Sequence, residues 1–133
     1  MSLDLLAGEW RIEATFPGGM SGTGRTTFEW VLGGAFLLQR VKTDVDGPPE
    51  GLCVIGPEEG GGFAQHYFDS RGVVRLYAMT LDDELWTLER DDVQRFIGRF
   101  EDGGDTIRGA WEWHRDGAWQ HDFDLVYRRS VAP

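Results

Sequence analysis

The sequence predicts an all-β protein that folds as a single antiparallel up-and-down β-barrel of about ten strands. Two observations predict this fold. Apolar and polar residues alternate with a period of two along most of the chain, and Gly- or Asp-rich turns interrupt the alternation about every ten residues. Short antiparallel strands would leave two exposed edges unless the sheet closes, and an up-and-down barrel is the natural closure. Residues 1–133 are therefore expected to form one domain.

The predicted elements follow one another without a linker or a low-complexity segment. A short apolar run at residues 3–7 predicts one helical turn before the first strand. The predicted strands cover residues 9–16, 24–32, 35–44, 51–56, 63–69, 73–81, 84–90, 94–101, 105–115 and 119–129.

The first two strands are assigned by their alternation. Even-numbered apolar residues alternate with charged and polar ones, so the even-numbered residues are expected to face inward. The third strand, which begins at Phe36, is apolar on both faces, and the pattern assigns a facing neither to it nor to the fourth strand. Cys53 in the fourth strand is expected to be a small core residue. The inward residues of the first two strands are predicted to be Trp10, Ile12, Ala14, Phe16, Phe28, Trp30 and Leu32.

Turn lengths assign the facing of the fifth to tenth strands. A two-residue turn pairs residues of opposite parity, and a three-residue loop pairs residues of the same parity. Counted from Trp111, this rule predicts that Met79 lies opposite Trp86. It also places His66 opposite Tyr77 and His121 opposite Trp113. The predicted inward residues include His66, Phe68, Arg75, Tyr77, Met79, Trp86, Leu88, Arg90, Phe96, Gly98, Phe100, Ile107, Gly109, Trp111, Trp113, His121, Phe123 and Tyr127.

The charge balance excludes several classes of partner. The chain has 13 basic and 23 acidic residues and a net charge of −10, whereas a protein that follows nucleic-acid phosphates needs the opposite sign. An acidic membrane surface would repel it as well. A single cysteine permits no internal disulfide, and the N-terminus lacks the features of a signal peptide or a membrane span. We expect a cytoplasmic protein without a nucleic-acid or membrane partner; a homodimer stays open.

A barrel of about ten strands is wider than its side chains can fill, so a ligand cavity is expected. Alternate turns fall at one end, which should bring Arg75, Arg90 and His121 to the same mouth. Two inward arginines in an acidic protein need a counter-charge or a ligand, and a carboxylate, phosphate or enolate suits a guanidinium. Alternatively, Arg90 turns outward and pairs with Asp91 or Asp92. The predicted ligand-binding residues are His66, Arg75, Tyr77, Trp86, Arg90, Trp111, Trp113 and His121.

The ends of the chain resemble a known family. Gly8-Glu9-Trp10 opens the first strand and Tyr127-Arg128-Arg129 closes the last, which resembles the calycin superfamily of lipocalins and fatty-acid-binding proteins. The resemblance implies that Trp10 lies at the closed end and is covered by Arg129, with Arg128 as the alternative. Segments 32–37 and 66–72 are most similar to the bacterial lipocalin-like proteins of unknown function grouped as DUF1579.

Nitrobindin, a haem-binding barrel, is a weaker resemblance. Its ligand histidine lies on the last strand, about where His121 falls, but the glycines of its opening motif are replaced by Ile12 and Ala14. This resemblance implies haem as an alternative cofactor, held by His121. No Cys or His spacing indicates a zinc site, and no other metal is expected.

The sequence therefore favours a lipocalin-like binding protein for a small hydrophobic or amphipathic molecule, without a cofactor. The first alternative is a nitrobindin-like haem protein that uses His121. The second is an isomerase or cyclase in which His121, His66 or Tyr77 moves a proton while Arg75 holds a developing enolate. Binding ranks above catalysis because the chain shows no distinctive catalytic spacing.

Overall fold

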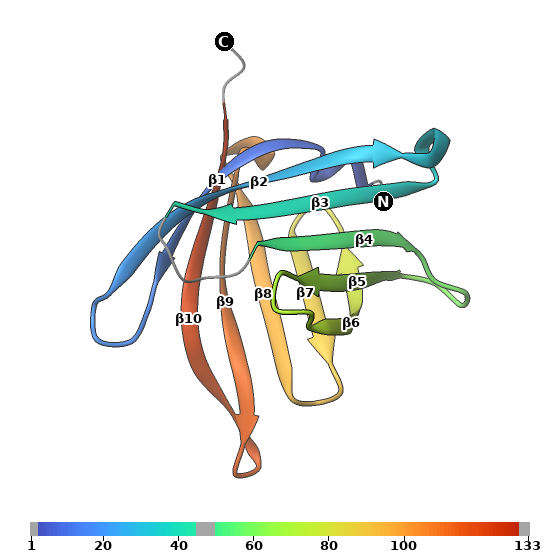
Figure 1. Cartoon of the computed structure of the whole chain (residues 1–133). Coiled ribbons are helices and arrows are strands. Elements are labelled where there is room, and N and C mark those ends of the chain that lie inside the picture. Colours follow the sequence, from blue (N-terminus) through green and yellow to red (C-terminus); the bar gives the residue numbers. More distant parts are fainter. Residues whose placement is uncertain (1–2, 45–49, 131–133) are drawn as a thin grey trace.

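The computed structural model describes residues 3–44 and 50–130. In this part of the chain, ten antiparallel strands pair in chain order, and the first pairs with the last to close a barrel (Figure 1). The all-β up-and-down barrel predicted from the sequence is confirmed. The strands are β1 (Gly8–Thr15), β2 (Ser21–Val31), β3 (Phe36–Thr43), β4 (Gly51–Pro57), β5 (Phe63–Asp69), β6 (Val74–Leu81), β7 (Leu85–Arg90), β8 (Gln94–Glu101), β9 (Thr106–Arg115) and β10 (Ala118–Arg129).

Three short 3-10 turns complete the described secondary structure. The first, η1 (Leu3–Leu5), is the helical turn expected before β1; η2 (Leu32–Gly34) joins β2 to β3, and η3 (Asp102–Gly104) joins β8 to β9. The prediction that Leu32 ends an inward strand is wrong, because this residue lies in η2 and is 76% exposed. No helix among the described residues is long and apolar enough to span a membrane.

The registers of β7, β8 and β9 agree with the predictions. Trp86 lies opposite Gly98, and Phe96 lies between Leu88 and Trp111. Between β6 and β7 the prediction is wrong by two residues, since Met79 pairs with Leu88 and Leu81 pairs with Trp86. The Asp82 carboxylate accepts hydrogen bonds from the two backbone amides of residues 84 and 85, which moves the turn along the chain. A shift of two residues leaves the facing unchanged.

The predicted facing of β5 is wrong. Its odd-numbered residues point inward, with Gln65 opposite Tyr77 and Tyr67 opposite Arg75, whereas His66 and Phe68 point outward. The reason is the loop to β6, because the backbone amide of Asp69 bonds to the carbonyl of Val73 and leaves three residues in the turn rather than two. A slip of one residue exchanges the two faces of a strand.

The predicted facing of His121 is also wrong. A β-bulge between His121 and Phe123 inserts one residue into β10. As a result, Phe123 lies opposite Trp111 as expected, but Gln120 takes the place opposite Trp113 and His121 lies opposite Glu112. The turn itself is shorter than predicted, because Ala118 pairs with Arg115 and leaves two residues in the turn rather than three. The shorter turn reverses the facing of His121, and the bulge restores the predicted facing from Phe123 onward.

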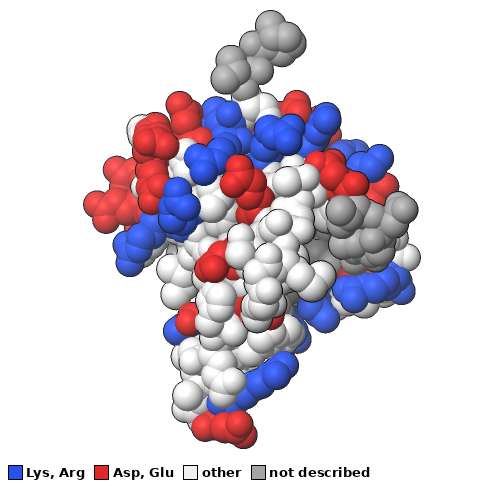
Figure 2. Space-filling view, turned by 90° about the vertical axis from the view of Figure 1, so that its left-hand side faces the viewer, with Lys and Arg blue, Asp and Glu red and all other residues white. Residues whose placement is uncertain are grey.

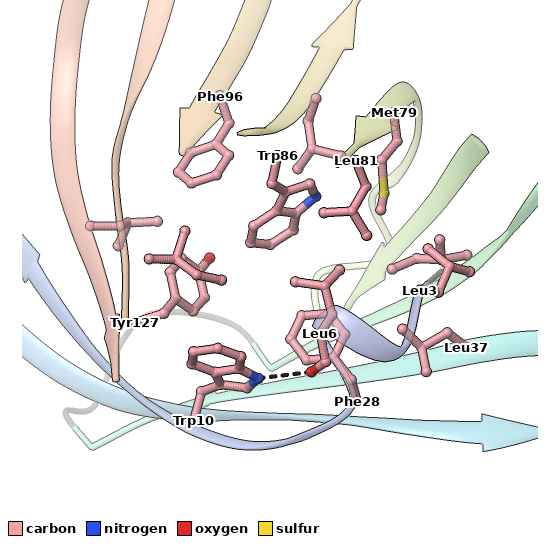
Figure 3. Close-up of a cluster of buried hydrophobic side chains, with 14 of the residues drawn as sticks. Leu3, Leu6, Trp10, Phe28, Leu37, Met79, Leu81, Trp86, Phe96 and Tyr127 are labelled. Atoms are coloured by element: carbon pink, nitrogen blue, oxygen red, sulfur yellow. Dashed lines mark hydrogen bonds between the residues drawn. The ribbon is translucent and has the colours of Figure 1, made fainter. Parts of the chain in front are cut away.

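An apolar cluster fills the end of the barrel that carries η1 (Figure 3). Trp10 is fully buried there, and its indole nitrogen donates a hydrogen bond of 2.8 Å to the Leu6 carbonyl. The close approach of β8 and β9 needs glycine, since a Cβ atom on Gly109 would lie 2.5 Å from the Ile97 carbonyl oxygen. The fully buried large side chains are Leu6, Trp10, Leu37, Ile55, Met79, Trp86, Phe96 and Ile107.

Arg129 covers this end from outside the cluster. Its guanidinium lies 4.1 Å from the centre of the Trp10 ring and donates to the carbonyls of Ala7 at 2.6 Å and Leu5 at 3.0 Å. The adjacent Arg128 points the other way and pairs with Glu13 on the surface. Arg129, rather than Arg128, is therefore the arginine that seals the barrel.

Candidate functional site

A cavity of about 340 Å³ occupies the other half of the barrel. The β1–β2, β7–β8 and β9–β10 hairpins extend on this open side, whereas the β2–β3 and β4–β5 connections lie on the opposite side (Figure 1). Most of the cavity wall is apolar or aromatic, and Arg75 is the one charged residue among its described lining residues. The aromatic lining residues are Phe16, Tyr67, Tyr77, Trp86, Trp111, Phe123 and Tyr127.

The predicted site residues divide into three groups. Arg75, Tyr77, Trp86 and Trp111 line the cavity. Arg90 and Trp113 lie beside it at the open end, both half-buried. His66 and His121 are the corrections, since both are exposed on the outside of the barrel.

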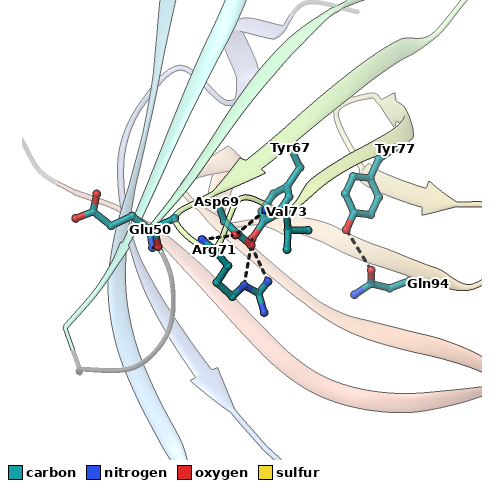
Figure 4. Close-up of polar contacts among 8 residues, drawn as sticks. Glu50, Tyr67, Asp69, Arg71, Val73, Tyr77 and Gln94 are labelled. Atoms are coloured by element: carbon teal, nitrogen blue, oxygen red, sulfur yellow. Dashed lines mark hydrogen bonds and ion pairs between the residues drawn. The ribbon is translucent and has the colours of Figure 1, made fainter.

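A hydrogen-bonded cluster joins Arg90 to the cavity wall. The Tyr77 hydroxyl donates to the side-chain oxygen of Gln94 at 3.1 Å (Figure 4). The same oxygen accepts from Arg90 Nη2 at 3.4 Å. Arg90 Nε is buried and has no partner among the described residues. The alternative in which Arg90 turns outward to Asp91 or Asp92 is not the one observed. Gln94 was not predicted as a site residue, because an isolated glutamine carries no pattern signal.

Arg75 brings a second guanidinium to the mouth. It is half-buried, lies opposite Tyr67 and lines the cavity. No carboxylate among residues 3–44 and 50–130 forms an ion pair with Arg75 or Arg90; the pairs observed involve other arginines. The mouth therefore has positive charge without a counter-charge from the described residues, which favours an anion.

The Asp69 carboxylate, at the end of β5, already has hydrogen-bond partners. Asp69 Oδ2 accepts from Arg71 Nη2 at 2.6 Å and from the Tyr67 hydroxyl at 2.7 Å (Figure 4). The hydrogen bonds from Arg71, followed by those from Tyr67 and the backbone, hold the pKa of Asp69 well below its usual range. Burial, together with the hydrogen bond to Asp69, raises the pKa of Tyr67 to about 12. Asp69 thus neutralises Arg71 and fixes Tyr67 as a neutral wall residue.

Two further polar side chains face the cavity, and neither was predicted. Gln39 and Gln65 are each 4% exposed, both line the cavity, and the Oε1 atom of each lacks a hydrogen-bond partner within the described chain. Gln39 was missed because the pattern assigned no facing to the third strand, and Gln65 because the parity of the fifth was reversed. The buried indole nitrogen of Trp86 is also unpaired there, and Figure 3 shows it on the side of the ring away from Tyr127.

The histidines do not fit the haem alternative. Nε2 of His121 lies 3.0 Å from the Asp124 carboxylate on the outer surface, and the ring of His114 stacks on Trp119. His66 is exposed, and no histidine is among the described residues that line the cavity. An axial ligand for a haem inside the barrel is therefore not provided by His121. Nor do these histidines reach a substrate held in the cavity, which removes them from the isomerase hypothesis.

The described residues offer no other metal site, since they contain no group of three or more His, Cys, Asp or Glu side chains placed to hold an ion. Cys53 is buried, and its burial raises the thiol pKa to about 12. Such a thiol stays protonated at neutral pH, as expected for a core residue rather than a nucleophile or a metal ligand.

The geometry of the described residues defines a class, a closed ten-stranded antiparallel barrel with a sealed end and an internal cavity. Among solved structures, the crystal structure of Rv2717c from M. tuberculosis is similar, with a TM-score of 0.61 and 15% identity over 97% of this chain and 95% of that one. A de novo designed fluorescence-activating β-barrel is also similar, with a TM-score of 0.50 and 15% identity over 96% and 95%. At this identity the likeness shows the fold alone. No family model and no curated protein matches the chain.

Proposed function

We propose that this protein binds a small, mainly apolar molecule with an anionic end, whose body fills the barrel cavity and whose charge lies at the mouth. The observation that carries the proposal is the pair of half-buried guanidiniums of Arg75 and Arg90, which have no carboxylate partner in the described chain. A carboxylate or phosphate on the ligand would satisfy them with charge-assisted hydrogen bonds.

The walls support an apolar ligand body. Trp111 packs against Phe96 and Tyr77 with ring centres 5.4 and 5.7 Å apart, so it forms a fixed aromatic surface. The cavity volume of about 340 Å³ lies near the lower end of the roughly 300–1,000 Å³ typical of small-molecule sites. The proposed ligand is therefore a small amphipathic acid.

The family and the partners belong to the same proposal. The contact between Arg129 and Trp10 supports membership of the calycin superfamily, because the lipocalin resemblance implies that contact. Lys and Arg side chains on the face in Figure 2 are interspersed with Asp and Glu rather than joined in a basic stripe. Together with the net charge of −10, this supports a protein without a nucleic-acid partner. The single cysteine supports a cytoplasmic location.

The test is a binding series of octanoate, decanoate and dodecanoate against the amide of each acid. Trp86 and Trp111 line the cavity, so tryptophan fluorescence reports occupancy, and calorimetry gives the dissociation constants. We expect each acid to bind about tenfold more tightly than its amide, since a charge-assisted hydrogen bond contributes about 1.5–3 kcal/mol.

Two arginine variants test whether Arg75 binds the anionic end of the ligand. Arg75→Gln should remove most of the preference for the acid, because Arg75 is the one charged side chain among the described residues that line the cavity. Arg99→Gln is the matched control, since it makes the same change of charge at an exposed residue of β8. The proposal is wrong if no acid in the series binds, or if Arg75→Gln leaves the ratio of acid to amide affinity as it is in the unchanged protein.

A further inference from the structure

Two buried glutamines face the cavity and lie deeper in it than the half-buried arginines. Arg75 is the second residue of β6 and Arg90 the last of β7, both at the open end. Gln65 lies opposite Tyr77, one inward position deeper than the pair of Tyr67 and Arg75, and Gln39 lies two residues after Leu37 of the apolar cluster. A ligand whose anionic end meets the arginines therefore directs its other end toward these amides.

The amide of Gln39 has a fixed orientation. The Thr26 hydroxyl, which is fully buried, donates its single proton to the Arg40 carbonyl at 2.8 Å, so its oxygen can only accept from other groups. Gln39 Nε2 donates to that oxygen at 3.1 Å. A turned amide would place two acceptors against each other, so Gln39 must present its Oε1 atom as an acceptor.

Neighbouring hydroxyl donors are already used. The Tyr67 hydroxyl donates to Asp69, and the Tyr77 hydroxyl donates to Gln94. Consequently, Gln39 Oε1 and Gln65 Oε1 find no donor in the described chain. A buried acceptor left unpaired costs about 1–3 kcal/mol, and the cavity that both amides line is where a ligand can supply the missing donor.

We propose that the ligand carries a hydroxyl group at the end opposite its anionic group, and that this hydroxyl donates to Gln39, Gln65 or both. This inference rests on the proposed function. A second carboxylate would place acceptor against acceptor. An ammonium would bury a charge without a counter-ion, because no Asp or Glu is among the described lining residues. The ligand class is therefore an amphipathic hydroxy acid.

The test compares each alkanoate of the series with its ω-hydroxy acid of the same length by calorimetry. Without a protein acceptor, the hydroxyl must lose its water partners, so the plain acid binds more tightly. With the glutamines present, we expect the ω-hydroxy acid of the best-fitting length to bind about tenfold more tightly than the plain acid. Because the acids of the series differ in length, the hydroxyl lies at a different depth in the cavity for each one.

Variants of three glutamines test whether the two amides cause the preference for the ω-hydroxy acid. Gln39→Met and Gln65→Met together should reverse the preference and keep or improve binding of the plain acid. Of the two single variants, the one that removes the accepting oxygen should have the same effect, which identifies the glutamine that the hydroxyl uses. Gln120→Met is the control, since this glutamine is exposed on β10 and bonds to the Arg115 carbonyl.

The outcomes distinguish the two proposals. If plain acids bind in an Arg75-dependent manner and no ω-hydroxy acid binds more tightly, the hydroxyl inference is wrong and the proposed function stands. A preference that survives in the double variant also overturns the inference, because the hydroxyl then has another partner. If no acid of either kind binds, both proposals fall.

Discussion

The sealed end and the open half of this barrel differ in whether their buried polar groups are hydrogen-bonded. At the sealed end, Trp10 and Arg129 each donate to backbone carbonyls, and Trp10 packs in the apolar cluster. In the open half, Arg90 Nε and the oxygens of Gln39 and Gln65 are buried without a partner in the described chain.

This difference separates stability from function. Satisfied polar groups over a packed cluster contribute to the free energy of folding, whereas unsatisfied ones cost it. A protein keeps such groups where a ligand uses them, at the expense of stability. Substitutions at the sealed end should therefore destabilise the protein, and substitutions in the open half should affect ligand binding with little loss of stability.

The largest effect is expected from Trp10→Ala. Trp10 is fully buried and hydrogen-bonded, so its removal should lower the free energy of unfolding by about 3–5 kcal/mol. Phe16, further along the inward face of the first strand, is 41% exposed at the open end, and Phe16→Ala should cost less than about 1.5 kcal/mol. Urea denaturation measures both. Similar losses for the two variants would contradict the distinction between the ends.

Adjacent arginines give the next comparison. Arg129→Gln should lower the free energy of unfolding by about 2 kcal/mol, because it removes charge-assisted hydrogen bonds to two carbonyls and the contact with Trp10. Arg128→Gln breaks an exposed ion pair with Glu13 and should cost less than about 1 kcal/mol. Thermal and urea unfolding of the pair decide it, and equal effects would mean that the seal over Trp10 contributes nothing.

The same contrast explains what the sequence could predict. Strand order and most facing follow from alternation and turn length, which are local properties. The contact between Trp10 and Arg129 was predicted from the resemblance of the two end motifs to lipocalins rather than from a periodic pattern. The polar residues of the open half were predicted less well, because the loop before Val73 has one residue more than predicted and the turn before Ala118 one residue fewer, which reversed the facing of His66 and His121. These irregularities depend on side-chain contacts such as those of Asp69, which no periodic pattern records.

The stability of the protein at alkaline pH tests how deeply Cys53 is buried in the wall of the open half. Burial raises its pKa to about 12, from about 8.5 in an unfolded chain. Because the folded pKa is the higher one, the unfolded state loses its proton first, and stability falls as pH rises from about 8.5 toward 12. The expected slope is about 1.4 kcal/mol per pH unit.

Cys53→Ala is the comparison for that slope. Urea unfolding at a series of pH values between 7.5 and 10 should show the decline in the unchanged protein and a much flatter profile in the variant. Burial also raises the pKa values of Tyr67 and Tyr127, but their losses begin only near pH 10. Identical profiles in the two proteins would show that the thiol is not as deeply buried as the structure places it.

The smallest expected effect is a free energy of unfolding that stays unchanged or rises slightly, in contrast to the losses above. It is the most direct test of the difference between the sealed end and the open half. Gln65→Leu replaces a buried amide, whose oxygen has no partner in the described chain, by an apolar side chain of similar size. Losing an unsatisfied acceptor should leave the free energy of unfolding unchanged or raise it by up to about 1 kcal/mol. At the sealed end, Leu37→Gln makes the reverse exchange at a fully buried residue and should cost about 1–3 kcal/mol or more. If Gln65→Leu destabilises the protein as Leu37→Gln does, the Gln65 amide is satisfied in solution, and the open half is not the unsatisfied region that the structure indicates.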